Sequence, residues 1–161
     1  MAESLYQKTI MRLDAMKAQR LPLEPLKREV GQLLRPELPS WEDTSNDRAG
    51  EKKNINVYSS VPQEGVETCA DGLQGNLASE GTNWFRYRMG VEELNEIPAV
   101  RKWLQHREEI TYSLFASSNY YSHLNPTLMD GITFGDAPAW MEMNKERSGI
   151  VCQNFYVRDV W

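Results

Sequence analysis

The sequence contains few of the residues that build metal centres and covalent cross-links. Among its 161 residues are two cysteines and two histidines, and Cys69 and Cys152 lie far apart along the chain. Zinc-binding motifs need several such ligands at short spacings, so dense zinc-finger sets are excluded. Two distant cysteines also favour buried thiols in a reducing compartment over a disulfide framework. We therefore predict no metal, no cofactor and no structural disulfide.

Long hydrophobic runs and an excess of basic charge are also missing. No apolar stretch approaches the roughly 18–20 residues that a membrane-spanning helix needs, and the N-terminus lacks the features of a signal peptide. Lysine and arginine number 18 against 23 aspartate and glutamate, which gives a net charge of -5 at pH 7. A chain of this charge is not typical of proteins that bind nucleic acid by neutralising phosphates. We expect no membrane partner and assign no residue to a nucleic-acid contact.

Motifs of catalysis are absent as well. The sequence holds no phosphate-binding loop, no dinucleotide-binding glycine motif, no nucleophile elbow and no zinc-protease helix motif. His106 and His123 fall on one predicted helix, about 25 Å apart at roughly 1.5 Å per residue. His106 with Glu109 is typical of a solvated surface pair, and Cys69 lies on an apolar helix face that predicts a buried thiol. We predict that the chain is not an enzyme and rank acid–base catalysis through His106 as the weakest hypothesis.

The residues that are present predict a folded α+β chain. Hydrophobic residues make up 40% and charged residues 25%, which is ordinary for a soluble globular protein. Residues 1–39 are predicted as a hairpin of two antiparallel helices, 40–54 as an exposed loop and 55–161 as an α+β region. Within that last region we expect helices over about 60–80, 98–124 and 125–134 and strands over 83–89, 139–143 and 150–157.

Glycines and tryptophans suggest where this region makes close contacts. Three glycines inside the helix over 60–80 each cost up to about 1 kcal/mol relative to alanine, which predicts a close backbone neighbour or a kink. Three tryptophans fall on apolar phases and are predicted to be core: Trp84, Trp103 and Trp140. Two others lack an obvious core partner, and four basic residues form the main basic concentration. The candidate subunit or partner interface therefore comprises Trp41, Arg86, Arg88, Arg101, Lys102 and Trp161.

An ordered series of motifs connects the second half of the chain to a known family. A glycine- and alanine-bearing helix over 70–79 precedes Asn83-Trp84-Phe85, and the segments 100–104, 114–120 and 128–137 follow. This series resembles the N-terminal part of the head-to-tail connector, or portal, protein of short-tailed bacteriophages (podoviruses). The resemblance covers roughly residues 55–161, and the preceding helical region is compatible with it.

The resemblance implies a structural role. The fold would be a mainly helical wing-type region with a long helix and a C-terminal β-hairpin, part of a larger portal fold. The subunit would belong to a ring, typically of twelve copies, at one capsid vertex of the virion, assembled in the host cytoplasm. The ring would pass double-stranded DNA during packaging and ejection. Its partners would be the major capsid and scaffolding proteins, the terminase motor and the tail adaptor proteins.

Two further expectations accompany this interpretation. The chain stops at Trp161 within an apolar, strand-like run, so we expect a piece truncated at its C-terminus. The alternative hypothesis is a small phage or bacterial adaptor that binds another protein through Trp41 and Trp161 without forming a ring.

Overall fold

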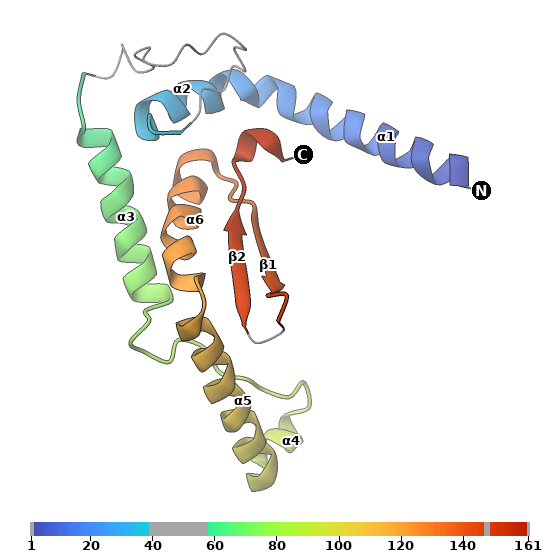
Figure 1. The fold of residues 1–161 in the computed structure, drawn as a ribbon, viewed down its shortest axis with the longest axis vertical. Coiled ribbons are helices and arrows are strands. Elements are labelled where there is room, and N and C mark those ends of the chain that lie inside the picture. The colour runs from blue at the N-terminus through green and yellow to red at the C-terminus, as the bar shows by residue number, and fades with distance from the viewer. Residues whose placement is uncertain (1, 39–57, 147–148, 161) are drawn as a thin grey trace.

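The computed structural model describes residues 2–38, 58–146 and 149–160, which form the α+β fold that the sequence predicts. Helices dominate, and the C-terminal part of the chain forms an antiparallel hairpin beside one of them (Figure 1). The loop predicted over 40–54 lies outside the described residues. The α-helices are α1 (Ala2–Arg20), α2 (Glu24–Leu34), α3 (Val61–Leu77), α4 (Glu92–Glu96), α5 (Pro98–Ser117) and α6 (Tyr120–Phe134); the strands are β1 (Ala139–Met143) and β2 (Ile150–Asn154); and 3-10 turns cover Leu21–Leu23 and Val157–Asp159.

Both N-terminal helices form, but the antiparallel hairpin predicted for them is wrong. A single 3-10 turn joins α1 to α2, and α1 projects away from the body of the molecule (Figure 1). Arg20 and Glu24, which flank this turn, both keep right-handed helical backbone angles. Pro22 and Pro25 each occupy the first turn of a helical segment, where proline is tolerated. The chain therefore continues in nearly helical geometry and never reverses.

Helix α3 packs beside α6 and supplies part of a small core. Val66 and Ala70 are buried on its inner face, and Gln74 Nε2 donates a hydrogen bond to the Tyr121 carbonyl at 3.3 Å. The close neighbour predicted from the glycines of this helix is not found among the described residues, because a Cβ built on any of them would meet none of these within 4 Å. The prediction of a buried Cys69 is also wrong, since this thiol is exposed while Cys152 is buried.

The close approach that requires glycine occurs elsewhere, where α2 crosses α6. A Cβ at Gly31 would lie 3.1 Å from Cε1 of the Phe134 ring. Phe134 is one of the few buried large side chains, so the α2 backbone presses directly on the core. Without a side chain at position 31, α2 can lie against the end of α6 and carry α1 with it.

The long helix predicted over 98–124 is interrupted. It ends at Ser117, and α6 begins at Tyr120, so Pro126 lies inside α6 and does not start a new helix as predicted. Ser118 is extended at the junction, and its Oγ accepts a hydrogen bond from the Tyr120 backbone N–H at 3.1 Å. The adjacent Asn119 side chain is bonded to the hairpin. Contact with a distant segment, invisible in local periodicity, therefore sets the break.

The C-terminal hairpin matches the prediction closely. Strand β1 pairs with β2 in a register that runs from Ala139 opposite Asn154 to Met143 opposite Ile150. The second strand ends at Asn154, earlier than predicted, and the following residues form a 3-10 turn. Every residue of β1 is exposed, including Trp140.

Candidate functional site

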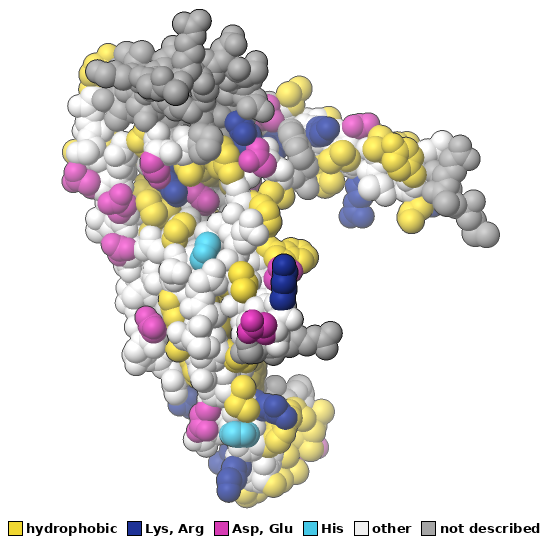
Figure 2. Space-filling model, in the orientation of Figure 1, with side chains coloured by type: hydrophobic (Ala, Val, Ile, Leu, Met, Phe, Trp, Pro, Cys, Tyr) yellow, Lys and Arg dark blue, Asp and Glu magenta, His cyan; other side chains and the backbone are white. Residues whose placement is uncertain are grey.

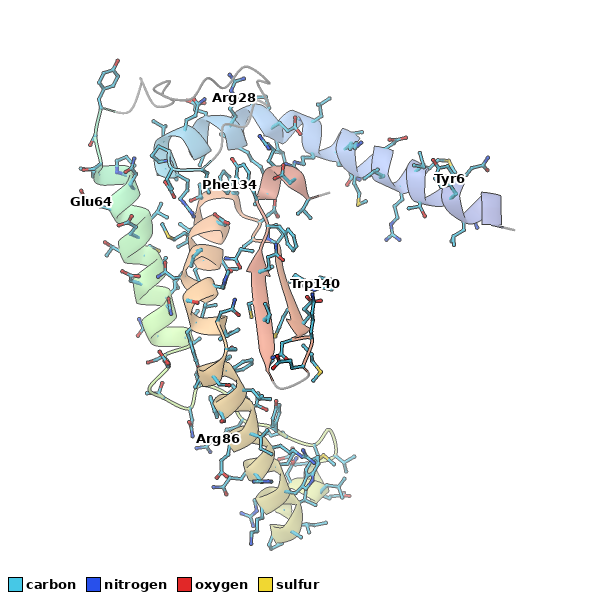
Figure 3. The ribbon with its side chains drawn as sticks, viewed as in Figure 1. Tyr6, Arg28, Glu64, Arg86, Phe134 and Trp140 are labelled. Atoms are coloured by element: carbon cyan, nitrogen blue, oxygen red, sulfur yellow. The ribbon has the colours of Figure 1, made fainter. Side chains whose placement is uncertain are left out.

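A cleft opens between helix α5, the short helix α4 and the extended segment 83–89. Its volume is about 790 Å³. We call it the α4–α5 cleft; it lies at the lower end of the molecule in Figure 3, where Arg86 is labelled. Its lining residues are mostly polar and charged: Asn83, Arg86, Tyr87, Arg88, Glu92, Asn95, Glu96, Arg101, Leu104, Gln105, Glu108, Glu109 and Tyr112.

The segment 83–89 forms one wall of the cleft without being a strand, which corrects the sequence prediction. Side chains replace a partner strand: Tyr112 Oη accepts a hydrogen bond from the Phe85 backbone N–H and donates one to the Phe85 carbonyl, each at 2.7 Å. The Tyr87 backbone N–H donates to Glu108 Oε1 at 2.8 Å. Helix α5 therefore satisfies the backbone of this segment, as buried or half-buried polar groups require.

A second set of bonds connects the segment to α4. The Met89 backbone N–H donates to Asn95 Oδ1 at 2.8 Å, and Asn95 Nδ2 donates to the Met89 carbonyl at 3.1 Å. One amide side chain thus pairs with both backbone groups of Met89. These bonds hold the arginines that flank Tyr87 in defined positions along the wall.

The cleft brings together three of the four basic residues that the sequence singles out. Arg86, Arg88 and Arg101 line it, whereas Lys102 is exposed on α5 and does not. Within the described parts of the chain, Arg86 and Arg88 form no ion pair, and Arg101 Nη2 donates to the Glu96 carbonyl at 3.4 Å. Four glutamates share the lining, so the surface carries both signs of charge: Glu92, Glu96, Glu108 and Glu109. Trp41 and Trp161 lie outside the described residues.

An aromatic cluster beside the cleft was only partly predictable. Trp84 is half-buried between α5 and α6, and its ring lies 6.2 Å from that of Phe115 and 6.3 Å from that of Tyr120 in near-parallel stacks. Phe115 and Tyr120 stack on each other at 4.4 Å. The sequence places Trp84 in the core, but the core prediction is wrong for Trp103 and Trp140, whose side chains are exposed.

Sequence patterns gave no sign of a buried ion pair between α6 and the end of α2. Arg35 Nη1 donates to Asp130 Oδ1 at 2.7 Å, and its Nε donates to Glu37. Burial raises the pKa of the Asp130 carboxyl above its ordinary value, while the guanidinium of Arg35 opposes that rise. The two residues are 95 positions apart, so only the folded chain brings them together.

The arrangement offers no assembled catalytic or metal-binding group among the residues that the structure describes. His106 Nδ1 lies 3.8 Å from Glu109 Oε2, and both side chains are more than half exposed. No three histidine, cysteine or acidic side chains there come close enough to hold a metal ion. In the same residues, none of the helices has the length and apolar character needed to cross a bilayer.

A further feature of the surface is its exposed hydrophobic side chains. Seven hydrophobic residues are buried among those described, whereas twenty-four large hydrophobic residues are exposed. Five of them lie on the projecting helix α1 and four on the two strands of the hairpin, and yellow side chains mark both regions in Figure 2. Isolated apolar side chains on a surface are normal, but contiguous apolar elements mark interaction sites.

Comparison with known proteins identifies the chain's relatives among phage proteins. A protein of Bordetella phage BPP-1 described as a probable portal protein is 30% identical over 88 residues, which are 55% of this chain and 16% of that protein. The aligned part therefore spans less than a fifth of that relative's length. A family model described as bacteriophage head to tail connecting protein matches residues 6–161, nearly the whole chain. This chain belongs to the bacteriophage head-to-tail connecting protein family.

Proposed function

We propose that this chain is the wing-like part of a portal subunit, and that copies of the complete subunit form a ring of twelve at one vertex of the phage capsid. Membership of the connector family supports the structural role. The portal description of the Bordetella phage relative supports a portal as the form of that role. The ring passes double-stranded DNA during packaging and ejection and carries the tail.

The exposed apolar surface is the observation that carries this proposal. Leu5 and Tyr6 on α1 are 70% and 69% exposed, and Trp140 on β1 is 57% exposed. At about 25 cal/mol per Å² of apolar surface removed from water, covering such elements strongly favours association. A chain that leaves most of helix α1 and all of strand β1 exposed is better suited to an assembly than to a monomer.

The α4–α5 cleft contributes a charged contact surface to the proposed assembly. Arg86 and Arg88 have no carboxylate partner among the described residues, while the chain as a whole has a net charge of -5. Acidic residues of a neighbouring subunit or partner can therefore pair with them, together with Arg101 and Lys102. Trp41 and Trp161 remain predicted members of this interface.

The proposed role is mechanical and needs no chemistry from this chain. The partners are other copies of the subunit, the major capsid and scaffolding proteins, the terminase motor, the tail adaptor proteins and the DNA that passes through. The site of action is the portal vertex of the virion, after assembly in the host cytoplasm.

The test is to purify the complete subunit and measure its assembly by native mass spectrometry and negative-stain electron microscopy. We expect closed rings of about twelve copies, and antibody labelling at a single vertex of intact virions. A subunit that stays monomeric or dimeric and is absent from virions would contradict the proposal and favour the adaptor hypothesis. The variant with Arg86→Glu and Arg88→Glu should form fewer rings than one with Glu92→Gln and Glu96→Gln, which keeps the arginines.

A further inference from the structure

We propose that helix α1 of one subunit packs along the outer face of α3 of the next subunit, so that this pair of helices forms a contact between neighbouring subunits of the ring. This inference rests on the proposed ring function and identifies which surfaces meet. The contact joins two different surfaces of the chain, which is the type of interface that closes into rings of more than two copies.

The first surface is one face of α1. Four residues at helical spacing lie on it: Leu5, Lys8, Arg12 and Met16. Lys8 and Arg12 are exposed, Leu5 is 70% exposed, and Met16 is 38% exposed. An apolar residue at each end with two cations between them makes a helix face that a partner can cover.

The second surface is the outer face of α3. Gly65, Thr68, Gly72 and Gly75 follow one another at spacings of three and four, on the side opposite the buried Val66 and Ala70. A Cβ built on any of these three glycines would meet no described residue within 4 Å. Each costs up to about 1 kcal/mol relative to alanine in a helix interior, and no contact with another described residue offsets that cost. A second helix packed on this face would offset the cost of the glycines, because helices approach most closely where side chains are smallest.

The charges of the two helices are complementary. Helix α3 carries three acidic residues, Glu64, Glu67 and Asp71, and no basic one. They run beside the glycines at spacings of three and four, and all three are exposed. Helix α1 carries four basic residues against two acidic ones. Opposite charges across an interface guide association and set the register of the contact.

The two surfaces also lie on opposite sides of the molecule. Figure 3 labels Tyr6 near the free end of α1 and Glu64 on the far side of the body, at the start of α3. In Figure 2, acidic side chains line the α3 edge, while basic and hydrophobic side chains mark the projecting α1. An arm on one side and its complement on the other allow each subunit to reach the next in a repeated, closed arrangement.

Charge reversal in the complete subunit tests the contact. The variant with Lys8→Glu and Arg12→Glu, and separately the variant with Glu64→Lys and Glu67→Lys, should each lower the yield of rings by about tenfold, because like charges then face each other. Combining all four changes should restore rings, since the charges are again opposite. Glu93→Lys on α4 shifts the net charge by +2, in the same direction as the +4 of the α3 variant, and should leave ring yield unchanged. Circular dichroism checks that each variant folds.

A cross-link tests proximity without disturbing charge. Cys69 is a native exposed thiol on α3, so Leu5→Cys introduces its counterpart on α1. A bismaleimide should join subunits into a ladder longer than a dimer, and Cys69→Ser should abolish the ladder. A cross-link confined within one chain would show that α1 covers its own subunit, and a product that stops at the dimer would show that two α1 helices meet; either result overturns the inference.

Different results would refute the α1–α3 contact and the portal function. Rings that form normally when the α1 and α3 charges are reversed, and that give no ladder, would refute the α1–α3 contact and leave the portal function standing. A wild-type complete subunit that forms no ring at all would refute the portal function itself.

Discussion

Arg35 Nη1 lies 2.7 Å from Asp130 Oδ1, and this buried contact fastens the end of α2 to α6. Their side chains are 8% and 10% exposed, so water screens the pair weakly. Because α1 continues from α2 through one 3-10 turn, the pair also fixes the direction in which α1 projects. The stability of this contact therefore bears on the arm that the proposed ring uses.

Removing one partner of this pair should be costly. Arg35→Met leaves Asp130 buried without its counter-charge, and we expect the free energy of unfolding to fall by about 3–5 kcal/mol. Urea denaturation followed by circular dichroism measures the loss. The double variant with Asp130→Leu replaces both charges by apolar groups and should recover most of it. A single variant within 1 kcal/mol of the wild type would contradict the assigned role.

The same variant should depend on pH in a defined direction. Burial raises the pKa of Asp130, and removal of Arg35 takes away the group that opposes this rise. A carboxyl with a raised pKa in the folded state stabilises the fold below its unfolded pKa of about 4, and that stability is lost as pH rises through the folded pKa. The destabilisation by Arg35→Met, measured as urea midpoints, should thus be smaller at pH 4 than at pH 7. Equal losses at both values would argue against a buried, proton-binding Asp130.

The Tyr112 hydroxyl should stabilise the extended segment 83–89. Tyr112→Phe leaves both backbone groups of Phe85 without their partner, which we expect to cost about 1–3 kcal/mol. Hydrogen exchange should speed up over residues 83–89 while α3 is unaffected. Tyr87→Phe is the matched control, because the Tyr87 hydroxyl bonds with Thr111 at an exposed position and with no other described residue. Equal effects of the two variants would mean that the Tyr112 hydroxyl has no special role in holding residues 83–89.

Asn119 should hold the hairpin against the helices. Its Nδ2 donates to the Cys152 carbonyl at 2.8 Å, and its Oδ1 accepts from the Cys152 backbone N–H at 2.7 Å. Asn119→Ala should cost about 1–3 kcal/mol and speed hydrogen exchange in β1 and β2. Gln153→Ala, at an exposed position on the same strand, should change neither measurement appreciably.

Two glycine substitutions should have opposite signs. Gly135 ends α6 with a φ of 76°, in the left-handed region, so Gly135→Ala should destabilise the fold by about 1–2 kcal/mol. Gly72 has helical geometry and open space around it, so Gly72→Ala should stabilise the isolated subunit by about 0.5–1 kcal/mol. Thermal denaturation measures both. If α1 of the next subunit packs on this face, Gly72→Ala should also reduce ring formation.

Much of the architecture was accessible from local patterns. Proline positions and helical periodicity predicted α1, α2 and α3, and alternation around a glycine-containing turn predicted β1 and β2. The resemblance to phage connectors, drawn from the spacing of aromatic and small residues, is confirmed by the family model. Of the candidate site, the basic concentration on neighbouring segments was visible, and three of its members do share a cleft.

The sequence by itself determined the elements whose causes are local: the helices α1, α2 and α3, and the residues that form the hairpin. Tertiary structure alone decided the interruption at Ser118, which depends on the hydrogen bonds between Asn119 and Cys152. It also decided that residues 83–89 are extended without a partner strand, because Tyr112 bonds their backbone. It also decided that Trp103 and Trp140 are exposed, because the contacts of a side chain depend on elements far away in the chain. Periodicity reports which face of an element is apolar; only the packed chain determines whether that face is already covered or is left for a partner.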